Sequence, residues 1–166
     1  MIYIHLVNIS IQLERPDSPD ALALITELNE ALNPELYPPE STHGFSVEKL
    51  IAQNVAFFVA RVDGAPAGCG GVKLFNEGEG NKGYGEIKRM FVRPQWRGLG
   101  LAQRTLSTLE DHALNHGIRL LRLETGIYQH DAIRLYERAG YREIGPFGEY
   151  KLDPLSRYYE KHVEQQ

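Results

Sequence analysis

A glycine-containing segment in the middle of the chain has the composition of an anion-binding turn. It runs Gln95-Trp96-Arg97-Gly98-Leu99-Gly100, between strand-forming residues 86–92 and a helical pattern that starts near Gly98. A helix N-terminus exposes unpaired backbone N–H groups and the positive end of the helix dipole, and glycines let that backbone approach a phosphate closely. The Arg97 side chain can add positive charge. The segment predicts a phosphate site built mainly from main-chain amides. A turn that binds nothing is the alternative.

The residues around this turn disfavour the common nucleotide-binding loops. A Walker A loop needs Gly-Lys-Ser/Thr, whereas Gly100 is followed by Leu101 and Ala102. A dinucleotide fingerprint needs a glycine three positions after Gly100, and that position is Gln103. It also prefers the first βα unit of a domain, whereas this turn lies in the middle of the chain.

The rest of the sequence supplies secondary structure in an order typical of an α/β domain with one mixed sheet. Ser18 before Pro19 and Ser46 before a short apolar pattern are helix N-caps, and Asp63-Gly64 is a hairpin turn. The expected helices are 19–32, 47–52, a helix from 98 to about 116, and 131–139. The expected strands are 2–13, 55–62, 67–75, 86–92, 120–124, 141–144 and 149–152.

Periodic apolar residues indicate the buried faces of two of these helices. The first helix has its expected stripe at Leu22, Ile25, Leu28 and Leu32. The expected stripe of the helix after the glycine turn is Leu99, Ala102, Leu106, Leu109 and Ala113.

Composition limits the kinds of partner and compartment. A length of 166 residues favours one domain, 1–166, and a net charge of −4 with a pI near 5.9 argues against nucleic acid as a partner. No apolar run is long enough for a membrane span, and no signal peptide is recognisable, so the cytoplasm is the expected location. Cys69 is the only cysteine and is expected to be a small buried residue rather than a reactive thiol.

Two motifs, together with their spacing, resemble the GNAT superfamily of CoA-dependent N-acyltransferases. Gln95-x-x-Gly98-x-Gly100 is similar to the family's Q/R-x-x-G-x-G/A signature, and residues 132–141 resemble its last helix. Residues 86–94 resemble the fourth strand, so the likeness spans about 85–144. Segments 37–41 and 146–150 resemble, more weakly, a bacterial subgroup of acetyltransferases. The resemblance implies the GNAT fold: a mixed, mostly antiparallel sheet with a splayed fourth strand and helices on both faces.

The resemblance also implies acetyl-CoA as the acyl donor and assigns its contacts. The backbone that follows Gln95 should bind the pyrophosphate, and the free edge of the splayed strand should pair with pantetheine like an added strand. A backbone N–H near Phe91 would hold the oxyanion. The implied contacts are Met90, Phe91, Val92, Gln95, Arg97, Gly98, Leu99, Gly100, Leu101, Ala102, Gln129 and Ile133.

Two side chains match catalytic positions of the family. Tyr136 would protonate the leaving thiolate, with a packed aromatic as the alternative. Glu86 aligns with a general base that would accept the proton of the amine, directly or through water. An ion pair with Lys88 or Arg89 is the alternative for Glu86. Strand alternation would place Glu86, Lys88, Met90 and Val92 on one face of the sheet, and helical spacing would place Gln129, Ile133 and Tyr136 on one arc, with Ala132, Leu135 and Ala139 on the next.

The acceptor is expected to be the amine of a small molecule. Lys88 or Arg89 could hold an acceptor carboxylate, or could face solvent from the edge of the splayed strand. Tyr37 and Glu40 are further candidate contacts, as are His43 and Tyr84. No metal-ligand spacing is present, so no metal is expected. A protein lysine or N-terminus as acceptor, and an acyl-CoA sensor without turnover, remain open. So does a homodimer built on an exposed Tyr158-Tyr159.

Overall fold

The computed structural model describes residues 5–32, 34–42, 45–76 and 82–165. Within these residues the helices and strands follow the order that the sequence predicts. Short 3-10 turns cover Pro39–Ser41 and Pro94–Trp96. The elements are β1 (Ile9–Leu13), α1 (Pro19–Ala31), α2 (Val47–Ala52), β2 (Ala56–Val62), β3 (Ala65–Phe75), β4 (Tyr84–Val92), α3 (Leu101–Asn115), β5 (Leu120–Gly126), α4 (His130–Arg138), β6 (Arg142–Ile144) and β7 (Ser156–His162).

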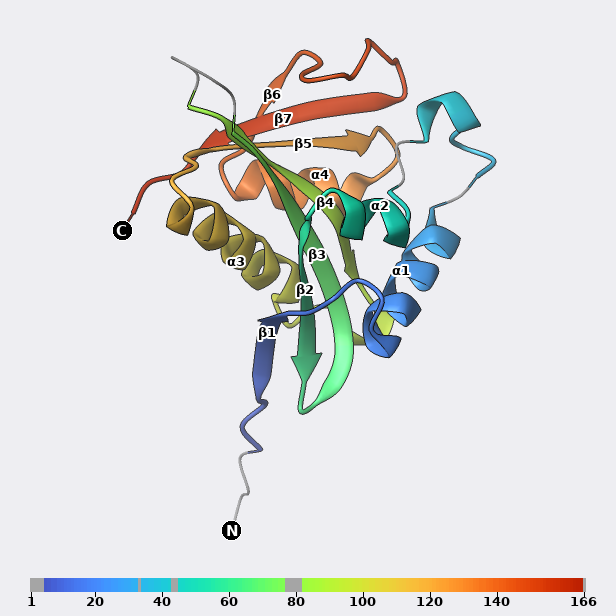
Figure 1. Ribbon diagram of the computed structural model, residues 1–166. Helices are drawn as coiled ribbons and strands as arrows, with labels where there is room; N and C mark the ends of the chain where they lie inside the picture. Colours follow the sequence, from blue (N-terminus) through green and yellow to red (C-terminus); the bar gives the residue numbers. More distant parts are fainter. Residues whose placement is uncertain (1–4, 33, 43–44, 77–81, 166) are drawn as a thin grey trace.

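The strands form one mixed sheet in the order β1-β2-β3-β4-β5-β7-β6, and only β4 and β5 are parallel. The mostly antiparallel sheet is therefore confirmed. β4 and β5 pair at Gly85–Leu121 and Glu86–Arg122 and then separate. Figure 1 shows β2, β3 and β4 diverging from β5 and β7 beyond this point. The splayed fourth strand is thus present, and within the described residues one side of its C-terminal half has no neighbouring strand.

Helices cover both faces of the sheet because each has one apolar side. The face under α1 and α2 is filled mainly by Ala21, Leu24, Ile25, Leu28, Leu50, Phe57, Val59 and Phe91. The opposite face, under α3 and α4, is filled mainly by Val72, Ile87, Leu106, Leu109, Ala113, Leu121, Leu123, Ile133 and Tyr159. Among the described residues, no helix is long and apolar enough to cross a bilayer.

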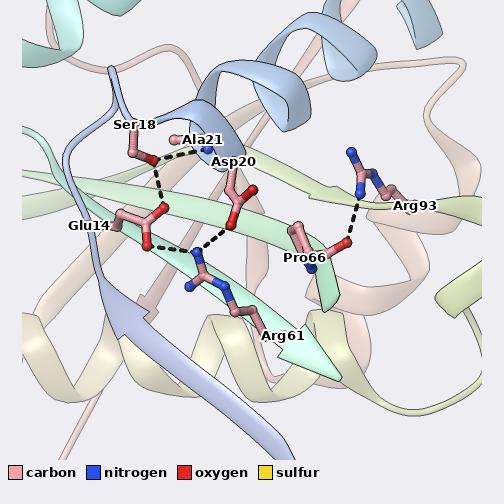
Figure 2. Close-up of polar contacts among 7 residues, drawn as sticks. All are labelled: Glu14, Ser18, Asp20, Ala21, Arg61, Pro66 and Arg93. Carbon is pink, nitrogen blue, oxygen red and sulfur yellow. Dashed lines mark hydrogen bonds and ion pairs between the residues drawn. The ribbon is translucent and has the colours of Figure 1, made fainter. Parts of the chain in front are cut away.

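A cluster of charged residues fixes the start of α1 against the strands (Figure 2). The Ser18 hydroxyl caps the helix by accepting from Ala21 N–H at 3.1 Å, and donates to the Glu14 carboxylate at 2.6 Å. Arg61 of β2 bridges Glu14 at 2.8 Å and Asp20 at 2.7 Å. This predicted N-cap is confirmed, and the cluster ties α1 to β2.

Arg93, directly after β4, makes the second attachment of α1. Its guanidinium donates to the Pro66 carbonyl at 2.8 Å (Figure 2) and to the Glu27 carboxylate on α1 at 2.6 Å. α1 is therefore held at its first turn and along its length, which places its last turn, with Leu28 and Asn29, beside the C-terminal half of β4.

The largest error of the sequence prediction lies at the C-terminus. The strand expected at 149–152 is wrong, because that segment contains a turn and the last strand is β7. β7 lies between β5 and β6, so Tyr158 and Tyr159 are only 3% and 1% exposed. They belong to the core and cannot form the exposed dimer surface that the sequence suggested.

Smaller differences concern element ends and helix faces. β1 begins at Ile9 rather than at residue 2, and residues 1–4 lie outside the described part. In α1, Leu24 is buried and Leu22 is exposed, and α3 starts at Leu101, which leaves Leu99 exposed. The glycines before α3 explain this late start, because both adopt a left-handed conformation that a helix cannot contain.

Candidate functional site

β4 contains a bulge at Arg89, which adopts a positive φ of 58°. On the β3 side, Lys88 pairs with Gly71 and Phe91 pairs with Cys69, so one extra residue lies on β4 between these two pairs. The Cys69 thiol donates to the Arg89 carbonyl at 3.3 Å and so supports the bulge. Burial raises the pKa of Cys69 to about 12, which confirms the expectation of an unreactive buried residue.

The bulge changes which side chains share a face. Lys88 lies on the α1–α2 side, over the Phe45 ring, while Met90 packs with the core on the α3–α4 side. Phe91 returns to the α1–α2 side. The predicted alternation, which put Met90 and Val92 on the face of Glu86 and Lys88, is therefore wrong beyond Lys88, since an inserted residue reverses the phase of a strand.

A cavity of about 430 Å³ opens where β4 and β5 separate. Because it lies in the gap of the sheet, it receives residues from both helical layers. Its walls come from the end of α1, from the middle of β4, from the end of β5 and from α4. The lining residues include Asn29, Tyr37, Ser41, Thr42, Phe45, Glu86, Lys88, Arg89, Met90, Glu124, Gln129, Ala132, Tyr136 and Tyr150.

Glu86 is buried in this cavity and uses its two carboxylate oxygens differently. Oε1 accepts from the Tyr150 hydroxyl at 2.5 Å and lies 3.1 Å from Lys88 Nζ. Both of these contacts use Oε1, and the residue as a whole is only 4% exposed. The ion pair expected as the alternative for Glu86 thus exists, but it engages one oxygen and leaves the other available to a proton donor in the cavity.

Tyr136 of α4 lines the same cavity. Burial raises the pKa of its phenol well above the ordinary value, and the nearby Glu124 carboxylate raises it further. The side chain therefore remains a neutral donor across the physiological pH range, and its edge contact with Tyr141, at 5.8 Å between ring centroids, positions the ring.

The other residues expected on the same arc of α4 divide between cavity and core. Gln129 lines the cavity at the start of the helix. Ile133 is buried in the core beneath α3 and α4, and Ala132 takes the expected place of Ile133 in the cavity wall.

Lys88 and Arg89 both reach the cavity, contrary to the solvent-facing alternative. Lys88 is engaged by Glu86, whereas Arg89 donates to Asn29 Oδ1 and has no ion-pair partner within the described residues. Tyr37 also lines the cavity, where its hydroxyl accepts from Tyr128 N–H at 2.9 Å.

The remaining candidate contacts lie elsewhere. Glu40 borders a wider adjoining groove of about 1300 Å³ and does not line the cavity. Tyr84 borders the same groove and is stacked on Phe75 at 4.6 Å. His43 lies outside the described residues. Among the residues that are described, no group of three acidic, His or Cys side chains could hold a metal ion.

Sequence reasoning missed Tyr150, Asn29 and Phe45, which all line the cavity. Tyr150 lies in the segment 146–150 that resembles the bacterial subgroup, and this was the only signal that could have selected it. Asn29 lies one residue from Leu28, on a helix whose last turn no sequence pattern could place beside β4.

The glycine turn lies just beyond the bulged half of β4. Gly98 and Gly100 have φ values of 86° and 73°, and a Cβ atom built on either would meet no atom within 4 Å. Among the residues that the structure describes, no side chain caps α3, and its first backbone bond runs from Arg104 N–H to the Gly100 carbonyl at 3.0 Å. The first amides of α3 therefore face open space, as an anion-binding helix terminus requires.

Comparisons with known proteins find related sequences and similar solved structures. The model of the acetyltransferase (GNAT) family matches residues 25–141. An IAA acetyltransferase from Azospirillum brasilense is 43% identical over 93% of this chain and 97% of its own length. An aminoalkylphosphonate N-acetyltransferase from Salmonella typhimurium is 31% identical over 76% of this chain and 80% of its own length. The crystal structure of a protein from Klebsiella pneumoniae, provisionally named an acyl-CoA N-acyltransferase, matches with a TM-score of 0.75 and 36% identity. The match covers 94% of this chain and 98% of that chain.

Proposed function

Because this chain belongs to the acetyltransferase (GNAT) family of N-acetyltransferases, which use acetyl-CoA, we propose that it transfers the acetyl group directly to the amine of a small molecule. One observation carries the proposal. Where β4 and β5 separate, a cavity is lined by both Glu86 and Tyr136, and β4 continues along the chain to the glycine turn before α3. The proposal treats residues 1–166 as one acyltransferase domain.

Binding of the donor is assigned to main-chain groups. The amides from Arg97 to Ala102 would hold the pyrophosphate at the N-terminus of α3, with Gln95 and the Arg97 side chain beside them. The edge of β4 from Met90 to Val92 faces no strand on the β5 side and would pair with pantetheine. Gln129 lies where it could add a contact, whereas the core position of Ile133 makes it the weakest of the assigned contacts.

Catalysis is assigned to two groups that line the cavity, one on β4 and one on α4. Glu86 would take the proton of the acceptor's ammonium through Oε2, directly or by way of a water, while Lys88 and Tyr150 hold Oε1 in place. A backbone N–H near Phe91 would stabilise the oxyanion. Tyr136 would donate to the leaving thiolate, a role that suits a phenol with a raised pKa because it is still protonated when it is needed.

The shape of the cavity favours a small acceptor. About 430 Å³ between two helical layers can surround a small amine, but not a polypeptide. Two of the relatives have names that specify small-molecule substrates, IAA and aminoalkylphosphonate. The adjoining groove of about 1300 Å³ supports a second candidate, in which the N-terminus or a lysine of a protein enters from that side.

Thiol release distinguishes these possibilities. The protein is mixed with acetyl-CoA and either a panel of small amines or a panel of lysine-containing and N-terminally free peptides, and free CoA is measured with a chromogenic thiol reagent. We expect release above the enzyme-free rate with a small amine. Release with peptides alone would favour the second candidate. Binding of CoA without release in either panel would contradict an enzymatic role.

A further inference from the structure

We propose that Arg89 binds a carboxylate of the acceptor, so that the acceptor is an amine that also carries a carboxylate, as an amino acid does. The inference rests on the proposed function, because it concerns the acceptor side of the same cavity. It adds the chemical class of the acceptor and the residue that selects it.

The first observation is that the Arg89 guanidinium makes fewer hydrogen bonds within the described protein than its N–H groups allow. Only two buried side-chain polar atoms lack a hydrogen-bond partner among the described residues, Arg89 Nε and Thr105 Oγ1. The guanidinium has five N–H donors, yet its one hydrogen bond within the described residues goes to Asn29 Oδ1. Burial lowers the pKa of the guanidinium, as expected for a cation taken from water without a compensating anion.

Other partly buried arginines show how this protein normally satisfies such a group. Arg61 pairs with two carboxylates at 2.7 and 2.8 Å, Arg93 pairs with Glu27 at 2.6 Å, and Arg122 pairs with Glu160 at 3.3 Å. Arg89 has no such partner in the described part of the chain. A buried cation is costly unless an anion pairs with it, so the missing carboxylate is the group that a ligand would have to supply.

The second observation is the position of this cation. Arg89 is the bulged residue of β4 and lines the cavity between Lys88 and Met90. Lys88 cannot serve instead, because its ammonium lies 3.1 Å from the Glu86 carboxylate. The hydroxyl-bearing Ser41 and Thr42 also line the cavity and could hydrogen-bond to the same anion.

The chemistry of a guanidinium favours a carboxylate as its partner. A guanidinium presents parallel N–H groups that match the two oxygens of a carboxylate, and this geometry gives directional recognition as well as attraction. Arg89 is three residues from Glu86 on one strand, which limits their Cα separation to roughly 10 Å. One small molecule can therefore place its carboxylate at Arg89 and its amine within reach of the Glu86 carboxylate.

Matched pairs of amines test the proposal. The proteinogenic L-amino acids and their decarboxylated amines, such as L-tryptophan with tryptamine and L-phenylalanine with phenethylamine, are titrated by calorimetry into protein saturated with CoA. Arg89→Gln removes the charge, and Arg89→Lys keeps it but removes the fork. Arg15→Gln is the control, because Arg15 is an exposed arginine paired with Asp17 away from the cavity.

We expect at least one amino acid to bind wild type at least about ten-fold more tightly than its decarboxylated partner, from the strength of a charge-assisted hydrogen bond. Arg89→Gln should abolish that preference, while the Kd of the decarboxylated amine and the Kd of CoA should stay within about three-fold of their wild-type values. Arg89→Lys should fall between, and Arg15→Gln should match wild type. In turnover assays with acetyl-CoA, Arg89→Gln should raise the KM for the amino acid more than it lowers kcat.

Three results would overturn the proposal: no amino acid that binds in an Arg89-dependent manner at millimolar concentration, equal weakening of both members of each pair, or a loss of CoA affinity in Arg89→Gln. Failure of the proposed function gives a different result. In that case amino acids would bind in an Arg89-dependent manner, but no thiol would be released when acetyl-CoA replaces CoA.

Discussion

The turn before α3 and the cavity beside β4 are both suited to bind an anion, but they do so with different parts of the chain. The turn offers main-chain amides at one helix terminus, and Gly98 and Gly100 shape it within a few residues. The cavity offers the side chain of Arg89, placed by a bulge in β4 and bordered by α1, α4 and the β6–β7 loop. A main-chain site is encoded locally, whereas a side-chain site depends on the whole fold.

This difference predicts opposite responses to mutation. Anion binding at the turn should survive changes of side chain and be lost when the backbone conformation changes. Binding and catalysis in the cavity should survive small backbone adjustments and be lost when single polar atoms are removed.

Replacing Glu86 by Gln should lower kcat by about 100-fold or more, the usual size of a general-base contribution. Gln keeps the shape, but it cannot take a proton from the amine. The KM for acetyl-CoA should change little, because Glu86 lies in the acceptor cavity rather than at the turn.

Glu110→Gln is the matched control for this change. Glu110 is also a partly buried carboxylate paired with a lysine, since its Oε2 lies 3.0 Å from Lys161 Nζ, but it does not line the cavity. A similar loss of kcat in both variants would show that Glu86 acts through stability, and normal kcat in Glu86→Gln would contradict its catalytic role.

Gly100→Ala should raise the KM for acetyl-CoA and the Kd for CoA by about 5- to 30-fold, because an L-residue in the left-handed region costs about 1–2 kcal/mol. Gly100 has a φ of 73°. Gly117→Ala is the control, because Gly117 has a φ of 77° at the other end of α3. Both variants should lose similar stability, so a CoA affinity that falls equally in both would contradict the turn as the phosphate site.

Tyr136→Phe should lower kcat by about ten-fold, at the low end for acid catalysis because a thiolate leaves readily. Its KM values should stay close to those of wild type, since Phe preserves the packing against Tyr141. Steady-state kinetics with an unfolding curve for each protein separates the two roles. An unchanged kcat would leave Tyr136 as a core aromatic.

The remaining prediction concerns the alkaline pH dependence of stability rather than activity. Burial raises the pKa values of Tyr136, Tyr141 and Tyr150 above those of the unfolded chain. Above pH ~10 the unfolded state therefore binds fewer protons than the folded state, and the free energy of unfolding falls as pH rises, by up to about 1.4 kcal/mol per pH unit for each tyrosine.

Urea unfolding between pH 8 and pH 11, values that bracket the ordinary tyrosine pKa of about 10, measures this slope. Tyr141→Phe should make the slope shallower by one tyrosine's share. A free energy of unfolding that stays constant across this range would mean that these phenols ionise as easily in the folded protein as in the unfolded one.

The turn, the element order and both helix caps could be predicted because each depends on neighbouring residues. Ser18 caps α1 and Ser46 caps α2 as expected, and Gly98 and Gly100 lie ahead of α3. These features follow from backbone rules that hold within one turn of chain.

The cavity could be predicted only in part. Glu86 and Tyr136 were selected through the family resemblance, but nothing local indicates a bulge at Arg89. A bulge arises from pairing between strands, and it reverses the side-chain alternation that sequence reasoning assumed for Met90. The same limitation explains the error at the last strand, because the choice between 149–152 and 156–162 depends on which segment fits between β5 and β6.

The central claim is that main-chain amides at the start of α3 hold the pyrophosphate of CoA, and amide NMR during a CoA titration tests it most directly. We expect the largest shifts at the amides of residues 98–102, with Gly117 at the far end of α3 nearly unchanged. Saturating CoA that leaves residues 98–102 unshifted, or shifts concentrated elsewhere, would contradict it.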